Sequence, residues 1–460
     1  MTRSLTFKVL AIGVLLLMLL VPLAMLDGLV RERQQMKRTA TSDVSATWGG
    51  AQTIAGPMLA VPYRIAKTET SNERSGTVYF LPDSLTYDAD LAPEVLTKGI
   101  YRVTLFETTV RIAAQFGPLD IAAVRVPESS LIWNDARLLM GVSDPSGLQS
   151  LITPVWGGST LKMEPASEAN VLPSAVAARV PAELLPITPD AAPVRVTADV
   201  QVRGSQSLRV VPLGKSTDVA MRSSWPSPSF VGALAARNRE VSDAGFEADW
   251  RVLFLNRGYP QVFRNDNSPS LLAGSVDGDD LMVEATYRGP NNESDGQAVG
   301  VRLIETANVY QQAERAAEYG FLFVLLTFTT FFFVEVLGGR RIHPLQYLLV
   351  GCAVALFYLL LLSLAEFIPF GAAYGASALA ILGLIAMYGR AVLGSWRMSG
   401  VVTGLLAVFY GYFYVLLQLD AYALLAGSIG LLVMLATVMW VSRKVDWYAF
   451  TPPKPQAPDA

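Results

Sequence analysis

The ionisable side chains with the most distinctive spacing lie in one short stretch. Glu335, Arg340, Arg341 and His343 fall within nine residues, between two long apolar segments, and His343 is the only histidine of the chain. An ionisable group at a membrane edge is costly unless it is paired. We therefore expect Glu335 to pair with Arg341 and so to clamp the two segments together.

A second carboxylate, Glu366, ends the next apolar segment. With Glu335 it offers the start of a proton or ion relay, but a relay needs more buried carboxylates than these two. His343-Pro344 has a simpler structural role, because proline at the first helical position loses no hydrogen bond and has a preset backbone angle. These residues are thus predicted to act in structure and coupling rather than in transport.

Catalytic and cofactor chemistry finds little support in the composition. One cysteine, Cys352, and one histidine exclude zinc sites built on these two residue types. The usual nucleophile–base or metal sets do not occur outside the apolar segments, so we expect no enzyme and no cofactor. A nucleic-acid partner is not expected either, because the chain has no concentrated basic face.

The elements that hold these residues are six apolar stretches, each long enough to cross a bilayer as a helix. They cover about residues 9–26, 319–337, 344–365, 369–388, 400–418 and 421–441 of the 460-residue chain, which is 52% hydrophobic. The first is preceded by Arg3 and Lys8 and has no convincing cleavage site, so we interpret it as an uncleaved anchor whose helix continues beyond the membrane.

Charge between the stretches sets the orientation. The connection at 340–341, the one containing Arg390 and Arg397, and residues 443–444 carry cations, whereas the alternate turns at 366–368 and 418–421 carry no Lys or Arg. Short cation-rich loops stay in the cytoplasm. Both termini are therefore predicted to be cytoplasmic, with residues 31–317 on the other side of the membrane.

Residues 31–317 differ in pattern from the rest of the chain. Between residues 27 and 318 there are 34 acidic against 27 basic residues, and segments such as 77–81, 194–200 and 208–211 alternate with the period of a strand. We predict a large, mostly antiparallel β-rich domain, with residues 165–193 as a candidate boundary between two subdomains. The predicted order is a helix at 1–30, this domain, a five-helix region at 318–442 and a tail at 443–460.

Five sequence blocks resemble one known family, the CreD proteins of the bacterial inner membrane, which are named for cell envelope integrity. The blocks, in family order along nearly the whole chain, are 56–63, 224–230 with Trp225 between serine and proline, 239–246, 343–366 and 445–449. Two departures stand out: Phe367 follows Glu366, and Ser227 occupies the Trp-Pro-x-Pro position, where the family often has histidines. Ideas about the family that rest on those imidazoles do not extend to this chain.

The resemblance implies a multi-pass inner-membrane protein of a Gram-negative bacterium, with a large periplasmic domain and a role in envelope maintenance and stress tolerance. We expect it to contact the lipid bilayer and an envelope protein or cell-wall component. The alternative is a transporter or lipid-handling protein that uses a cavity between the last five helices. A polar cavity reaching Glu335 or Glu366 would favour that alternative.

Overall fold

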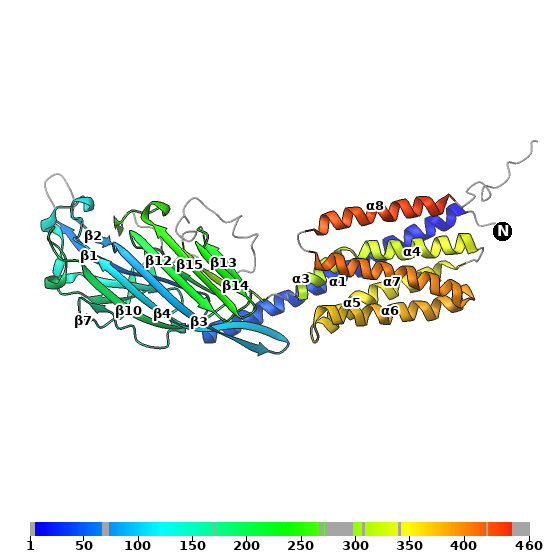
Figure 1. Ribbon diagram of the computed structural model, residues 1–460, viewed down its shortest axis with the longest axis horizontal. Helices are drawn as coiled ribbons and strands as arrows, with labels where there is room; N and C mark the ends of the chain where they lie inside the picture. Colours follow the sequence, from blue (N-terminus) through cyan, green and yellow to red (C-terminus); the bar gives the residue numbers. More distant parts are fainter. Residues whose placement is uncertain are drawn as a thin grey trace, which may run out of the picture. The chain divides into compact units, whose positions relative to one another are not determined.

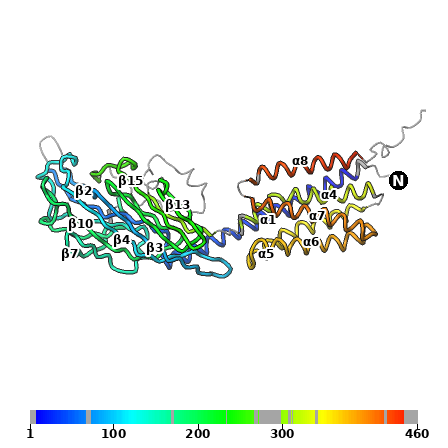
Figure 2. The backbone as a smooth tube through the Cα atoms, viewed as in Figure 1, coloured from blue at the N-terminus to red at the C-terminus, as the bar shows by residue number. Residues whose placement is uncertain are grey.

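The computed structural model describes residues 5–66, 73–168, 171–232, 234–265, 271, 298–305, 309–338, 342–419 and 422–443. The chain forms two compact units, a helical one from Met1–Lys37 and Ala307–Ala460 and a β-rich one from Arg38–Thr306. Figures 1 and 2 show the helices and strands of each unit. The chain passes from the first unit to the second within one helix, and returns near residue 306.

The helical unit contains the predicted spans. Six helices are long and apolar enough to cross a membrane, within the described residues, which confirms the six-helix prediction. The helices are α1 (Leu5–Trp48), the short polar α3 (Val309–Glu318), α4 (Gly320–Gly338), α5 (Pro344–Ala365), α6 (Phe370–Leu393), α7 (Trp396–Gln418) and α8 (Ala423–Ser442).

Helix α1 continues far beyond its apolar run, as predicted. Its 44 residues span about 66 Å at 1.5 Å per residue, roughly twice the hydrocarbon thickness of a bilayer. Pro22 lies inside it. The last residues of α1 belong to the β-rich unit, where Val44 packs against Val103 and Leu105.

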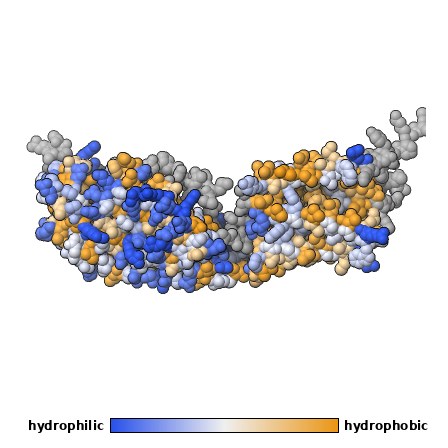
Figure 3. Space-filling model, viewed as in Figure 1, coloured by the Kyte–Doolittle hydropathy of each residue, from blue (hydrophilic) through white to orange (hydrophobic). Residues whose placement is uncertain are grey.

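Aromatic side chains fill the interior of the helical unit. Phe323 of α4 stacks on Phe413 of α7 at 4.1 Å between ring centroids, and Phe357 of α5 meets Tyr410 of α7 at 4.9 Å. The outer faces are apolar too, and Figure 3 shows hydrophobic residues over most of the visible face of this unit, α8 above all. Leu424 of α8 is 88% exposed. An exposed surface of this kind is suited to lipid.

Two sheets build the β-rich unit. The first has the order β13-β17-β11-β1-β5-β9-β8, with β2 beside β1 and β16 beside β2; the second has the order β14-β15-β12-β3-β4-β10-β6-β7. The strands are β1 (Gln52–Ile65), β2 (Arg74–Phe80), β3 (Ser84–Lys98), β4 (Tyr101–Phe116), β5 (Arg137–Val142), β6 (Val155–Trp156), β7 (Ser159–Thr160), β8 (Glu164–Glu168), β9 (Leu172–Arg179), β10 (Val194–Ser205), β11 (Ser207–Val210), β12 (Ser216–Ser223), β13 (Pro228–Gly232), β14 (Asn238–Ser242), β15 (Gly245–Leu253), β16 (Val262–Arg264) and β17 (Val299–Leu303).

The predicted strand character is confirmed, and most neighbours run antiparallel. β1 with β11 and β12 with β3 are the parallel pairs among the described strands. Side chains of the second sheet alternate between core and solvent along β3 and β4, whereas β1 is buried on both faces over most of its length. The two sheets share one core, and the Tyr87 hydroxyl of β3 donates a hydrogen bond to the Gly56 carbonyl of β1 at 2.6 Å.

The unit boundaries differ slightly from the predicted ones. The helical unit takes up residues to Lys37 and from Ala307, where the sequence suggested changes near 31 and 318. The stretch 165–193, proposed as an internal boundary, contains most of β8 and all of β9, which pair with each other at the edge of the first sheet. Residues on both sides of this stretch belong to the single compact unit Arg38–Thr306. A shared core joins both sheets, so the proline- and alanine-rich composition marks an edge hairpin and loop within one unit.

Candidate functional site

Glu335 lies near the C-terminal end of α4 with only 5% of its side chain exposed. Its carboxylate accepts hydrogen bonds from the Ile342 backbone N–H at 2.9 Å and from the Tyr347 hydroxyl of α5 at 2.8 Å. Lys8 of α1 forms an ion pair with the same carboxylate. One buried carboxylate therefore joins α1, α4 and α5.

The partner predicted for Glu335 was Arg341. Arg340 and Arg341 lie outside the described residues, so their pairing stays a prediction. The structure adds Lys8, which the sequence reasoning did not connect to Glu335. A signal was available, because Lys8 immediately precedes the first apolar run and a cation at that position also needs a carboxylate at the membrane edge.

His343 caps the start of α5. Its Nδ1 accepts a hydrogen bond from the Leu345 N–H at 3.2 Å, and the Gln346 side chain accepts one from the His343 N–H at 2.9 Å. This reciprocal arrangement satisfies two N–H groups that a helix start leaves without intrahelical partners. Pro344 occupies the first turn. In this geometry His343 has a capping role, fixing where α5 begins beside Glu335.

Glu366 lies at the opposite end of α5, where it is the C-terminal cap. Its carboxylate faces Arg33 of α1 at 3.5 Å, and 9% of the Glu366 side chain is exposed. Gln34, the next residue of α1, donates a hydrogen bond to Glu314 of α3 at 3.1 Å. Helix α1 thus meets two further carboxylates of the helical unit, Glu366 and Glu314.

The two ion pairs lie at opposite ends of the bundle. Lys8 and Arg33 are 25 residues apart on one helix, which corresponds to about 38 Å along the helix axis. The hydrocarbon core is about 30 Å thick. Both pairs therefore fit the two edges of a membrane, where a paired charge is tolerated, and α1 is fastened to the bundle at each edge.

Trp225 follows β12 in the β-rich unit and is half-buried. Its indole N–H donates to the Ile304 carbonyl at 2.9 Å, and the ring packs against the common core. The backbone N–H of Trp225 also donates a hydrogen bond to the Ser223 hydroxyl at 3.2 Å. The ring thus fixes this turn onto the chain segment that follows β17.

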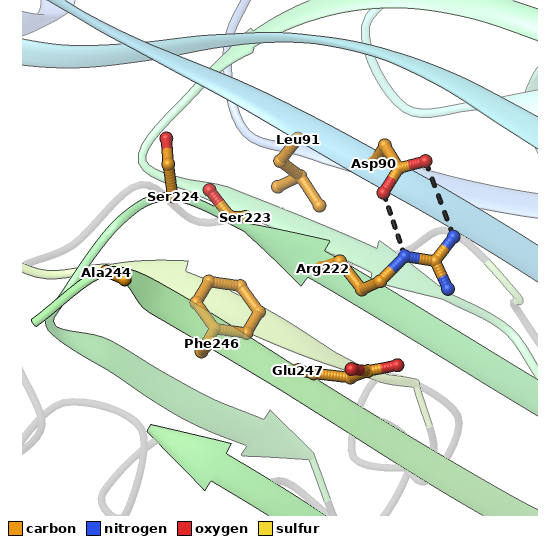
Figure 4. A pocket seen from close by; sticks show the side chains of 8 residues that line it. All are labelled: Asp90, Leu91, Arg222, Ser223, Ser224, Ala244, Phe246 and Glu247. Carbon is orange, nitrogen blue, oxygen red and sulfur yellow. Dashed lines mark hydrogen bonds and ion pairs between the residues drawn. The ribbon is translucent and has the colours of Figure 1, made fainter. Parts of the chain in front are cut away.

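A shallow pocket opens next to this turn, with a volume of about 310 Å³. Figure 4 shows that its wall comes from three strands: Asp90 and Leu91 of β3, Arg222 and Ser223 of β12, and Phe246 and Glu247 of β15, with Ser224 and Ala244 beside them. Segments 224–230 and 239–246, which begin 15 residues apart in sequence, contribute to one surface.

Charge in the pocket is partly neutralised. The Arg222 guanidinium donates to Asp90 at 2.9 Å and to Asp88 at 2.7 Å. The hydrogen bond from Arg222 lowers the pKa of the Asp90 carboxyl, and the same contact raises the pKa of Arg222. Both groups therefore stay charged at any physiological pH, and the pair is a fixed part of the wall.

In the described part of the chain, no three His, Cys, Asp or Glu side chains gather in a way that could hold a metal ion. Several ionisable residues that come together instead form ion pairs between strands or between helices. The geometry offers binding surfaces and charge clamps.

Comparison with known proteins places nearly the whole chain in one family. Residues 4–448 match the family described as "Inner membrane protein CreD". The chain is 28% identical over 447 residues to the inner membrane protein CreD of Escherichia coli (strain K12), covering 96% of this chain and 93% of that one.

Among solved structures, an M1 zinc metallopeptidase of Deinococcus radiodurans aligns with 37% of this chain and 39% of its own, at 7% identity and a TM-score of 0.19. A likeness at that score supports no conclusion about fold or activity. The family match, in contrast, extends over the helices and the β-rich unit alike. The chain belongs to the CreD family of inner membrane proteins.

Proposed function

We propose that this protein supports cell envelope integrity and stress tolerance without catalysing a reaction. In this proposal the β-rich unit lies in the periplasm and binds an envelope partner, while the helical unit anchors it. Both termini lie in the cytoplasm. The observation that carries the proposal is the fastening of α1, the helix that leads into the β-rich unit, by an ion pair at each end of the bundle.

The charge distribution supports this orientation. Arg390 lies in the last turn of α6 and Arg397 in the first turn of α7, on either side of the short connection, and Arg443 follows α8. The turn after α5, in contrast, carries Glu366. The Arg390 guanidinium lies 4.5 Å from the centroid of the Trp396 ring. A cation held over an aromatic ring is typical of the headgroup region.

The ion pairs of Glu335 and Glu366 favour anchoring over transport. Each is engaged by a cation from α1, and Glu335 also accepts hydrogen bonds from Ile342 and Tyr347. Between them the bundle is filled by stacked aromatic rings such as Phe323 and Phe357. A relay needs carboxylates that exchange protons along a wet path, and these two instead serve as tie points for a helix.

Topology reporters test the orientation in the intact protein. A reporter that works only in the cytoplasm should be active after Ala460 or within 391–398 and inactive within 285–297. A reporter that works only after export should give the reverse pattern. Cytoplasmic activity of the insertion within 285–297 would overturn the periplasmic placement and the partner-binding role with it.

The role itself is tested by complementation in a strain without this protein. The full chain should restore growth under envelope stress. A variant that lacks 50–304 but keeps α1 and the bundle should reach the membrane without restoring growth. Full rescue by that variant would assign the function to the helices and revive the transport alternative.

A further inference from the structure

Strand β14 forms the last edge of the eight-stranded sheet within the described residues. It pairs with β15 through residues 238–242, and all five of its residues are exposed. The outer side of an edge strand presents N–H and C=O groups that no ladder satisfies. An extended segment of another chain can add to such an edge by backbone hydrogen bonds.

One face of this edge carries unbalanced negative charge, whereas Arg239 of β14 alternates to the opposite face. Glu240 of β14 lies directly opposite Glu247 of β15, and like charges opposite each other are unfavourable. Arg222 is the cation beside Glu247 in the register of β12 and β15, but its guanidinium donates to Asp90, as Figure 4 shows, and to Asp88. Neither glutamate forms an ion pair or hydrogen bond within the part of the chain that the structure describes.

The pocket described above lies at the start of the same β-ladder. Glu247 is part of its wall, and Phe246 and Leu91 supply apolar surface there. Lysine and arginine side chains suit such a place, because their aliphatic stems cover apolar surface while the charged head remains near carboxylates. The edge, the glutamate pair and the pocket thus form one surface, which we call the β14 edge surface (residues 238–247 with the pocket wall).

We propose that the β14 edge surface binds an extended segment of an envelope protein that carries basic side chains at alternate positions. Alternation follows from the strand period, which points every second side chain of an added strand to the face of Glu240 and Glu247. The chain's own segment 272–297 is a poor occupant, because it contains six acidic residues and one basic residue, Arg288. This inference rests on the proposed function and names the chemistry of the partner.

Binding of defined peptides to the full-length protein tests the proposal. The protein is placed in nanodiscs of phosphatidylcholine, whose zwitterionic headgroups do not attract a basic peptide. Fluorescence anisotropy then compares a labelled ten-residue peptide of alternating Lys and Val with its Glu and Val counterpart. We expect the Lys peptide to bind at least tenfold more tightly, with a loss of affinity at high salt.

Variants locate the binding. Glu240→Lys with Glu247→Lys should weaken the Lys peptide at least tenfold, and Glu240→Gln with Glu247→Gln should weaken it less. Glu94→Lys with Glu183→Lys is the matched control, because it makes the same charge change at exposed positions elsewhere in the unit and should stay within twofold of the wild type. Equal losses in the reversal and its control, or no preference for the Lys peptide, would overturn the proposal.

Crosslinking in cells separates this inference from the proposed function. A photo-crosslinking residue at Val241, which is 51% exposed on β14, should capture a protein through a basic segment, and the charge reversal should abolish the capture. The same residue at Leu255, which is 77% exposed away from β14, is the reference position. Capture of an envelope protein from Leu255 alone would refute the β14 edge surface and leave the partner-binding role in place.

Discussion

Replacing Glu335 with glutamine should destabilise the helical unit through the loss of one buried charge. The carboxylate binds Lys8 and accepts hydrogen bonds from Ile342 and Tyr347, and only 5% of the side chain is exposed. Removing one partner of a buried ion pair costs about 3–5 kcal/mol. Because Lys8 is 24% exposed and can turn its ammonium toward water, we expect about 2–3 kcal/mol for Glu335→Gln.

A double-mutant cycle isolates the ion pair from the hydrogen bonds. Lys8→Met keeps most of the length of the side chain and removes its charge, and it should cost about 1–2 kcal/mol by leaving the carboxylate without its cation. The double variant should be less destabilised than the sum, with a coupling energy of about 1–2 kcal/mol. Tyr347→Phe should cost about 1 kcal/mol as the loss of one interhelical hydrogen bond.

The assay is reversible unfolding of the full-length protein in mixed micelles, monitored by tryptophan fluorescence and circular dichroism. The same cycle with Arg341→Gln measures the pairing that the sequence predicts for Glu335. Coupling to Lys8 and to Arg341 together would mean that both cations share the carboxylate. A coupling of Lys8 with Glu335 below about 0.3 kcal/mol, within the additivity of independent sites, would refute the clamp on α1.

Three further predictions follow from other contacts of the chain. Arg33→Gln should destabilise the helical unit by about 1 kcal/mol in the same assay, because Glu366 loses its cation. Arg31→Gln is the control: its partner Asp27 is a surface neighbour on the same helix, so the unfolding free energy should change by under about 0.5 kcal/mol. Equal effects of the two substitutions would contradict the role of Glu366. Trp225→Phe should lower the free energy of unfolding by about 1 kcal/mol, because the hydrogen bond to Ile304 is lost. Trp225→Ala should lower it by about 2–3 kcal/mol, which is less than for a fully buried tryptophan because the ring is half-buried. An alanine variant as stable as the wild type would mean that the packing of this ring does not stabilise the unit. Because Arg222 lowers the pKa of Asp90, the pair stabilises the folded state above pH about 4, and this contribution is lost as the pH falls through the lowered pKa. The difference in unfolding free energy between the wild type and Arg222→Gln should therefore shrink between pH 7 and pH 2.5. A difference that stays constant over this range would contradict the linkage.

Much of the architecture follows from local properties of the sequence. A segment such as 344–365 is apolar for 22 residues, and in lipid such a segment must form a helix because every backbone group needs an internal partner. His343-Pro344 marks its start for the same local reason, as the capping hydrogen bonds show. Alternation along 194–200 likewise predicts a strand with one face in the core, and β10 has that pattern.

The partners of these elements were decided by tertiary structure. Lys8 and Glu335 are separated by 327 positions in the sequence. Local patterning cannot show that the start of α1 lies beside the C-terminal end of α4 and the start of α5. Residues 165–193 have the composition of a linker, yet they include strand residues at the edge of a sheet whose core extends through the whole unit. The order of strands within a sheet depends on which apolar faces bury each other.

The β14 edge surface shows the same division. The blocks 224–230 and 239–246 stand out in the sequence, but their composition does not reveal that they meet beside β3. Glu247 has Arg222 as its neighbour across the ladder, and strand register alone would pair them. Only the fold places Asp88 and Asp90 where they take up the guanidinium, because pairing follows distance and geometry in space. Span number and strand character are therefore properties of the sequence, whereas the charges that remain available for a partner are properties of the folded chain.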